Sequence, residues 1–302
     1  MEKKPTIVVT GSQGQLGRSL KDLESEYPQY KFVFLSRSDM PIHHFELVRQ
    51  FFEGIQPDYV INAAAYTAVD RAELEKELAF QVNAEAVGVM AAWCHQHGAK
   101  FLQVSTDYVF DGKGNHPYVE TDPTGPQSVY GSSKLAGEQQ AFQFNPDCIV
   151  VRTAWVYSPY GKNFFKTMVS LLRDKPTIHV VNDQVGTPTY VRDLAKALLD
   201  IIASGKWQPG VYHYSNEGRI SWYDFAVEII KQNNVNCSVC AITSEQYPTR
   251  ASRPKYAVLN KTKIQEKRQN FNQEARRAQG AWCERHKAQS AESHQAPCAR
   301  LA

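Results

Sequence analysis

The sequence predicts an α/β fold in which helices cover both faces of a parallel sheet, followed by a smaller C-terminal lobe. Short apolar runs alternate with helix-length segments through the first half of the chain, which is typical of a doubly wound sheet. Glycines stand directly between the first apolar run and the first helical segment. The length of 302 residues suits one large unit with a smaller appended lobe.

The first expected strand is the β-branched run at 6–10, which is too short for a helix. Further strands are expected at 31–35, 58–65, 100–110 and 147–157, with helices at 18–27, 46–55, 84–98 and 130–140 between them. The second half is less regular. It contains a loop that leads into an amphipathic helix ending near residue 202, a strand that starts at Val211, and a helix that starts at Ser221.

Residues 11–17 read Gly-Ser-Gln-Gly-Gln-Leu-Gly, with a strand before them and a helix after them. This order predicts a Rossmann-like dinucleotide-binding unit, in which glycines allow a tight turn and close approach of the backbone to a pyrophosphate. The helix N-terminus offers free N–H groups to the phosphates. We therefore expect the loop of Gly11, Gly14 and Gly17 to hold the cofactor, although the first glycine gap is one residue longer than usual.

The second strand ends in Ser36-Arg37-Ser38. An acidic residue at this point would accept hydrogen bonds from the ribose of NAD, whereas an arginine accommodates the 2′-phosphate of NADP. Arg37 therefore favours NADPH, and use of NADH stays open. A plain solvated loop charge is the alternative interpretation of Arg37.

Tyr130 and Lys134 lie four residues apart in a segment of helix formers, so they share one helix face. A neighbouring ammonium lowers the pKa of a tyrosine from about 10, and such a phenol exchanges protons with a substrate oxygen. Thr106 ends an earlier strand, and its hydroxyl is expected to share a carbonyl oxygen with Tyr130. Ser105 is the fallback for this role.

The net charge of +3 lies in the tail from residue 266 onward, so the remainder is neutral and favours no nucleic-acid surface. No apolar stretch reaches the length of a membrane span, and the first strand starts by residue 6 without a signal peptide. A cytoplasmic location is the expectation. We divide the chain into a dinucleotide-binding domain at 1–160, with some later segments returning to it, a mainly substrate-binding lobe at 161–265, and a poorly ordered tail at 266–302.

Seven motifs in this order resemble the extended short-chain dehydrogenase/reductases, and among them the dTDP-4-dehydrorhamnose reductase family. They are TGSQGQLG, NAAAYTAVDRAE, STDYVFDG, YGSSKLAGE, RTAWVY, NDQVGTPT and ASRP. The resemblance covers roughly residues 5–264. It implies reduction by NADPH or NADH of the C4 keto group of dTDP-4-dehydro-6-deoxy-L-mannose, the last step of dTDP-L-rhamnose synthesis.

The resemblance also implies roles for individual residues. The catalytic residues are Thr106, Tyr130 and Lys134. The cofactor-binding residues that it implies are Gly11, Ser12, Gln13, Gly14, Ala63, Ala64, Ala65, Tyr66 and Thr67. To these we add, from the sequence itself, Gly17, Arg37, Tyr130 and Lys134. The residues that contact the sugar nucleotide are Thr106, Asp107, Trp155 and Arg253. Filling the core is the alternative role for the Trp155 ring.

The chain departs from the family at three places. Pro41-Ile42-His43-His44 replaces an Asp-Ile-Thr-Asp stretch near the adenosine, and Ser19 and Arg192 replace glutamates that bind magnesium in some members. We therefore expect no metal. Residues 266–300 contain no Val, Ile, Leu or Met, so they cannot form the amphipathic helix that closes other members.

Other functions stay open at this point. A nucleotide-sugar epimerase or dehydratase would regenerate its cofactor, but the single Asp107 after Thr106 favours reduction over dehydration. A non-catalytic regulator that binds nicotinamide cofactor, like the regulatory subunit of methionine adenosyltransferase, is the third interpretation. The sequence also leaves monomer and homodimer open.

Overall fold

The computed structural model describes residues 3–233 and 237–267. Six parallel strands form the central sheet in the order β10-β5-β4-β3-β1-β2. They are β1 (Thr6–Thr10), β2 (Lys31–Leu35), β3 (Tyr59–Asn62), β4 (Lys100–Thr106), β5 (Ile149–Thr153) and β10 (Gly210–His213). The strand order reverses between β1 and β3, and ligands of such sheets bind beyond the carboxyl ends of the strands at this point.

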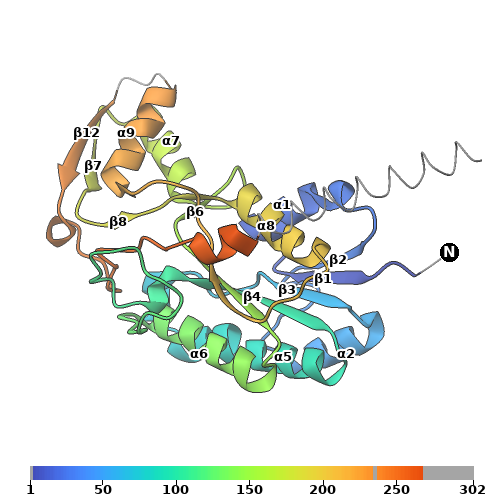
Figure 1. Ribbon diagram of the computed structural model, residues 1–302. Coiled ribbons are helices and arrows are strands. Elements are labelled where there is room, and N and C mark those ends of the chain that lie inside the picture. The colour runs from blue at the N-terminus through green and yellow to red at the C-terminus, as the bar shows by residue number, and fades with distance from the viewer. Residues whose placement is uncertain (1–2, 234–236, 268–302) are drawn as a thin grey trace, which may run out of the picture.

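Helices cover both faces of this sheet (Figure 1). One face carries α2 (Phe45–Ile55), α5 (Ala86–Gln96) and α6 (Val129–Phe144), and the other carries α1 (Gln15–Asp22) and α8 (Val191–Ala203). Strand β1 shows why both faces are apolar: Ile7 and Val9 belong to the core beneath α1 and α8, whereas Val8 belongs to the opposite core. The predicted doubly wound α/β fold is confirmed.

Shorter elements connect the layers. They are the helices α3 (Val69–Ala72) and α4 (Lys76–Phe80), a π-helical turn at Gln81–Glu85, and 3-10 turns at Glu24–Glu26, Asp107–Val109 and Ser244–Gln246. The π turn overlaps only the first two residues of the helix predicted at 84–98. Helix α6 begins at the predicted site, with the Ser128 hydroxyl accepting a hydrogen bond from the Gly131 N–H group.

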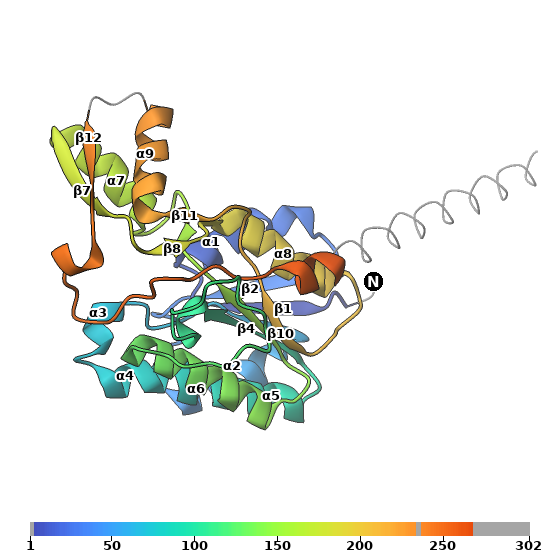
Figure 2. The ribbon, with the colours of Figure 1, turned by 60° about the vertical axis from the view of Figure 1, so that its left-hand side comes forward.

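A second, smaller unit lies beside the sheet (Figure 2). It contains α7 (Phe164–Asp174), β7 (Thr177–Val181), α9 (Trp222–Asn233) and β12 (Ser238–Ile242), with β7 and β12 paired in parallel. Its own core includes Met168, Leu172, Ile178, Phe225 and Ile229. Two further pairs adjoin it: β8 (Val185–Gly186) with β11 (Ile220–Ser221), and β6 (Val156–Tyr157) with β9 (Thr189–Tyr190).

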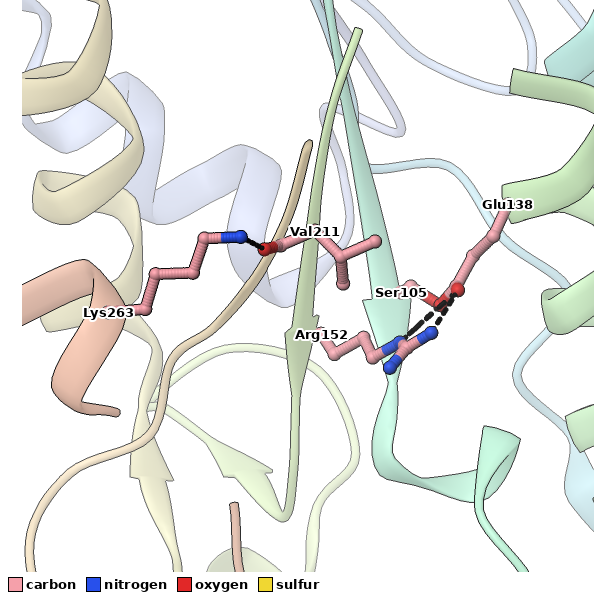
Figure 3. A network of polar contacts seen from close by, with 5 residues as sticks. All are labelled: Ser105, Glu138, Arg152, Val211 and Lys263. Carbon is pink, nitrogen blue, oxygen red and sulfur yellow. Dashed lines mark hydrogen bonds and ion pairs between the residues drawn. The ribbon is translucent and has the colours of Figure 1, made fainter. Parts of the chain in front are cut away.

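The chain leaves this lobe and returns to the large sheet between α7 and α9. Helix α8 and strand β10 form that return. The lobe is thus built from two separate stretches of chain. The predicted domain boundary at residue 160 stays a prediction. Residues 262–267 are helical, and Lys263 Nζ donates to the Val211 carbonyl oxygen of the edge strand β10 at 2.6 Å (Figure 3).

Poor order is expected for the tail at 266–302. Residues 268–302 of this tail lie outside the described part of the chain. Within residues 3–233 and 237–267, no helix is both long enough and apolar enough to cross a membrane. The same residues contain no cluster of three or more His, Cys, Asp or Glu side chains arranged to hold a metal ion. Of the two family magnesium positions, Ser19 is buried in α1 and Arg192 pairs with Glu26.

Candidate active site

A cavity of about 860 Å³ opens at the carboxyl ends of the central strands and reaches the lobe. Most residues predicted for the site line it: Gly11, Gln13, Gly14, Arg37, Ala63, Ala64, Ala65, Tyr66, Thr67, Thr106, Asp107, Tyr130, Lys134 and Trp155. Ser12, Gly17 and Arg253 are outside this lining. Segments far apart in sequence thus meet at the strand ends, as the fold predicts.

The glycine-rich turn between β1 and α1 is packed tightly enough to exclude side chains. Gly11 has a φ of +66°, and a Cβ atom there would lie 2.7 Å from the Ala64 nitrogen. A Cβ atom at Gly17 would lie 2.5 Å from the Gly11 carbonyl oxygen. Gly17 therefore permits close packing of α1 on the turn, whereas Gly11 brings the turn against the segment after β3.

A chain of buried hydrogen bonds aligns the ends of three strands. The Thr10 hydroxyl donates to Asn62 Oδ1 at 2.5 Å, and Asn62 Nδ2 donates to Gln103 Oε1 at 2.7 Å. The Ala64 N–H group donates to the Thr10 hydroxyl oxygen at 3.2 Å. Sequence reasoning missed this chain, because its members come from different strands and match no local motif.

Arg37 lines the end of the cavity beyond β2, beside Met40, Ile42 and His43. The Asp39 carboxylate is turned back on its own segment, where it accepts hydrogen bonds from the Ser36 N–H group at 2.8 Å and the Ser36 hydroxyl at 2.5 Å. These bonds lower the Asp39 pKa. Arg37 is therefore the charged group that this loop presents to the cavity.

These features fit a dinucleotide. Gly14 is the N-cap of α1, and Gly14, Gln15 and Leu16 line the cavity, so the helix N-terminus is available to a pyrophosphate. Because Gly11 lies so close to Ala64, no side chain could be accommodated at this position of the turn. The Arg37 guanidinium at the end of β2 suits a ribose 2′-phosphate.

Tyr130 lines the cavity from the first turn of α6, but its pKa differs from the sequence expectation. Burial raises the Tyr130 pKa to about 12, and a hydrogen bond with Thr106 offsets part of that rise. The expected lowering by Lys134 is therefore wrong for this structure. Lys134 Nζ instead donates to the Val104 carbonyl oxygen at 2.6 Å. Desolvation of the phenolate outweighs the attraction that sequence spacing suggests.

Lys134 is only 4% exposed, which makes its charge costly. Burial lowers the Lys134 pKa to about 8, while the nearby Glu138 carboxylate raises it and so opposes this effect. Lys134 therefore titrates within reach of neutral pH.

The two hydroxyls at the end of β4 differ in their partners. Ser105 donates to Glu138 Oε1 at 2.5 Å, whereas Thr106 donates to Asp107 Oδ1 at 2.9 Å and also contacts Tyr130. This arrangement favours Thr106 over Ser105 as the hydroxyl available to a ligand. The buried Asp107 carboxyl has a pKa raised to about 7 by desolvation, and its Oδ2 atom has no hydrogen-bond partner.

Trp155 lies where the sheet meets the lobe. Its ring stacks on Trp222 of α9, with ring centroids 3.5 Å apart and planes at 9°. Gly186 makes this packing possible, because a Cβ atom there would lie 2.5 Å from the Trp155 ring. Trp222 also lines the cavity and was missed from the sequence, since no motif links α9 to Trp155.

Arg253 is held beside the cavity by an acidic residue from α3. Arg253 Nη2 donates to Asp70 Oδ2 at 2.5 Å, and the Ala251 N–H group donates to Asp70 Oδ1 at 3.0 Å. Arg253 Nη1 is buried without a hydrogen-bond partner. Asp70 thus ties the segment after β3 to the segment that carries Arg253, a contact between two motifs that the sequence did not reveal.

The family model described as "RmlD substrate binding domain" matches residues 5–285. The dTDP-4-dehydrorhamnose reductase of Aggregatibacter actinomycetemcomitans is 41% identical over 271 residues, which cover 86% of this chain and 92% of that protein. This chain belongs to the dTDP-4-dehydrorhamnose reductase family. The spore coat polysaccharide biosynthesis protein SpsK of Bacillus subtilis is 39% identical over 260 residues, covering 86% of this chain and 90% of that protein.

A solved member of the dTDP-4-dehydrorhamnose reductase family, from Bacillus anthracis in complex with NADP, superimposes with a TM-score of 0.84. It is 36% identical, and the match covers 88% of this chain and 93% of that one. The UDP-glucose 4-epimerase of Thermus thermophilus shares the fold, with a TM-score of 0.73 at 20% identity. The reductase family is therefore supported by sequence and fold together, and the epimerase likeness by fold alone.

Proposed function

We propose that this protein is an NADPH-dependent reductase that converts dTDP-4-dehydro-6-deoxy-L-mannose to dTDP-L-rhamnose. The main support is the meeting of Thr106, Tyr130 and Lys134 in one cavity that begins at the glycine turn. Arg37, at the end of β2, supports NADPH as the cofactor, with NADH as a second option. The relatives named above as dTDP-4-dehydrorhamnose reductases support the sugar and the nucleotide.

NADPH, when bound, would supply the hydride for reduction of the C4 keto group. The protein then has to place the keto oxygen and give it a proton. A Tyr130 pKa of about 12 keeps the phenol protonated at neutral pH, so its proton is available to the oxygen that becomes the new hydroxyl. The Thr106 hydroxyl, which donates to Asp107 Oδ1 in the absence of ligand, would turn its proton to the same oxygen and stabilise the charge that develops there.

Lys134 lies one helical turn beyond Tyr130. We assign it two roles, a hydrogen bond to the nicotinamide ribose and replacement of the proton that Tyr130 gives up. Its lowered pKa of about 8 suits proton transfer better than an ordinary lysine would. Activity that needs the ammonium is then retained below this pKa and lost as the pH rises through it.

The lobe end of the cavity is assigned to the sugar nucleotide. The stacked pair Trp155 and Trp222 offers a flat apolar surface to the deoxysugar. Asp107 Oδ2 is available to accept a sugar hydroxyl or, when protonated, to donate to one. We assign Arg253 to the phosphates on the strength of its position beside the cavity and its unpartnered Nη1.

A cytoplasmic location is part of the proposal. Cys94, Cys148, Cys237 and Cys240, the cysteines in the described residues, are all free thiols. Free thiols are usual in a reducing compartment. Fractionation of the native host tests this, and recovery in an extracellular fraction contradicts it.

The experiment that tests the function is incubation with NADPH and excess dTDP-4-keto sugar, with NADPH oxidation and the sugar product followed together. Many turnovers with dTDP-L-rhamnose as product are expected. Isomerised or dehydrated sugar without net NADPH oxidation identifies an epimerase or dehydratase instead. Cofactor binding without any chemistry identifies a regulator.

A further inference from the structure

Arg152 and Glu138 form a buried ion pair next to Ser105 (Figure 3). Arg152 Nε donates to Glu138 Oε1 at 2.9 Å, and Nη2 donates to Oε2 at 2.7 Å. The two side chains are 5% and 4% exposed. Glu138 follows Lys134 by four residues in α6, so Tyr130, Lys134 and Glu138 lie along one face of that helix.

A buried ion pair of this kind is not expected to add much to the stability of the fold. Desolvating both charges costs several kcal/mol per ion, and apolar residues of similar volume often serve stability as well or better. Here the Arg152 Nη1 atom also lacks a hydrogen-bond partner. A role in holding neighbouring groups in place accounts for the pair better than its own contribution to folding.

The neighbours of the pair are the strand ends that form the site. In the pairing of β4 with β5, Ser105 lies opposite Arg152 and Thr106 lies opposite Thr153. The Ser105 hydroxyl donates to the same Glu138 oxygen that receives the Arg152 Nε bond. One carboxylate therefore ties α6 to the two strands directly beside Thr106.

Arg152 extends this support to the segment after Thr106. Its guanidinium carbon lies 5.0 Å from the centre of the Phe110 ring, within the range of a cation–π contact. Phe110 follows the 3-10 turn Asp107–Val109 directly. The position of Asp107 thus also depends on the ion pair, through Arg152 and Phe110.

Glu138 also sets the electrostatic surroundings of Lys134. The Lys134 ammonium donates to a neutral carbonyl, and Glu138 is the acidic group whose attraction favours its charged form. On its other side Glu138 faces Arg152, which in turn faces His213. Burial and the Arg152 charge lower the His213 pKa to about 3, so His213 is neutral at neutral pH and adds no competing charge.

We propose that Glu138 is a positioning residue of the reductase, which fixes the Thr106 strand end against α6 and keeps the Lys134 ammonium charged in the buried site. This inference rests on the proposed reduction for its kinetic consequence. Its structural part, the ionisation of Lys134, does not depend on which sugar is reduced.

The test is Glu138→Gln, which keeps the shape and removes the charge. The matched control is Glu26→Gln, which removes one carboxylate from an exposed pair with Arg192 at 2.9 Å. In the Glu138→Gln enzyme we expect the alkaline limb of the kcat–pH profile to move to lower pH by about one unit or more, because an ionised partner shifts a pKa by that amount. The control should keep the wild-type limb.

A second measurement separates this inference from the proposed function. The Lys134 ε-carbon is followed by NMR through a pH titration, with the signal assigned by its loss in Lys134→Arg. Its midpoint should fall in Glu138→Gln even if the dTDP-sugar proves not to be the substrate. An unchanged midpoint, or reduced kcat with an unmoved alkaline limb, overturns the proposal and leaves Glu138 as a purely structural residue.

Two further variants keep the test decisive. Glu138→Asp retains the charge and should keep the titration of Lys134 near that of the wild type while lowering kcat. A shift as large as that caused by Glu138→Gln would contradict the charge argument. If Glu138→Gln alone does not fold, the double change with Arg152→Met also removes the guanidinium that would be left without its partner. The Lys134 midpoint should still move down, because Glu138 is the acidic group that favours the ammonium.

Discussion

The two ends of the cavity are built in different ways. At the end next to α1, the site is mostly backbone, because Gly11 brings the turn against Ala64 and Gly14 caps the N-terminus of α1 without a side chain. At the lobe end the site is made of side chains, with Trp155 stacked on Trp222. Both ends join segments that are distant in sequence, but the glycine spacing marks the first end in the sequence, whereas no local pattern marks the second. Substitutions at the first end should therefore change NADPH affinity, and substitutions at the second end should change the KM for the sugar nucleotide.

The largest effect is expected between the two ends, at Tyr130. Tyr130→Phe removes the proposed proton donor, so kcat should fall by about 10²–10⁴-fold. NADPH affinity, measured by fluorescence titration, should change by less than about threefold. If affinity and rate fell together by the same factor, Tyr130 would be a structural residue and not an acid.

Gly11→Ala should impair cofactor binding at the end of the cavity next to α1. Strain from the positive φ costs about 1–3 kcal/mol, and the added Cβ atom also meets Ala64. NADPH affinity should fall by at least about tenfold, measured by calorimetry, together with stability in urea. Gly205→Ala is the matched control, because Gly205 has a φ of +65° but nothing near its Cβ position. Equal losses of NADPH affinity in both variants would contradict a special role for Gly11.

Arg37→Ala sharpens the comparison within the cofactor end. Loss of a charge-assisted contact costs about 1.5–3 kcal/mol, so we expect NADPH to bind about tenfold more weakly or worse. NADH binding should be unchanged, since NADH has no 2′-phosphate. Arg49→Ala, at an exposed arginine of α2, serves as the control. A similar loss for both cofactors would show that Arg37 does not read the phosphate.

Trp222→Ala should affect the lobe end alone. We expect the KM for the sugar nucleotide to rise by about threefold to tenfold, because half of the stacked aromatic pair is lost, at about 0.5–1.5 kcal/mol for such contacts. NADPH affinity should be retained. Tyr247→Ala, at a residue that is 60% exposed, controls for loss of an aromatic ring in the lobe. A change in NADPH affinity without a change in KM would reverse the assignment of the two ends.

The same difference explains how much the sequence could predict. The alternation of strands and helices, the glycine turn and the Tyr130–Lys134 helix are encoded by short patterns, and the α/β fold and the family are confirmed. The roles of the individual site residues stay predictions. The contacts Trp155–Trp222 and Asp70–Arg253 join residues 67 and 183 positions apart, and no local pattern specifies them.

The error on Tyr130 has a related cause. Spacing on a helix shows which side chains are neighbours, but it does not show how deeply they are buried. In the folded chain, burial raises the Tyr130 pKa, and Lys134 points its ammonium at a backbone carbonyl. The direction of a pKa shift follows from the balance of desolvation and charge, and only the second of these is visible in the sequence.

The contact between Lys263 and Val211 has a consequence for the behaviour of the protein in concentrated solution. Strand β10 ends the six-stranded sheet, and an uncovered edge offers its carbonyls to a strand from another molecule. The Lys263 ammonium occupies one of those carbonyls and lies 4.4 Å from the Tyr212 ring centre. A chain cut before residue 262 would lose this charged cover, and we expect such a chain to self-associate through β10 at high concentration.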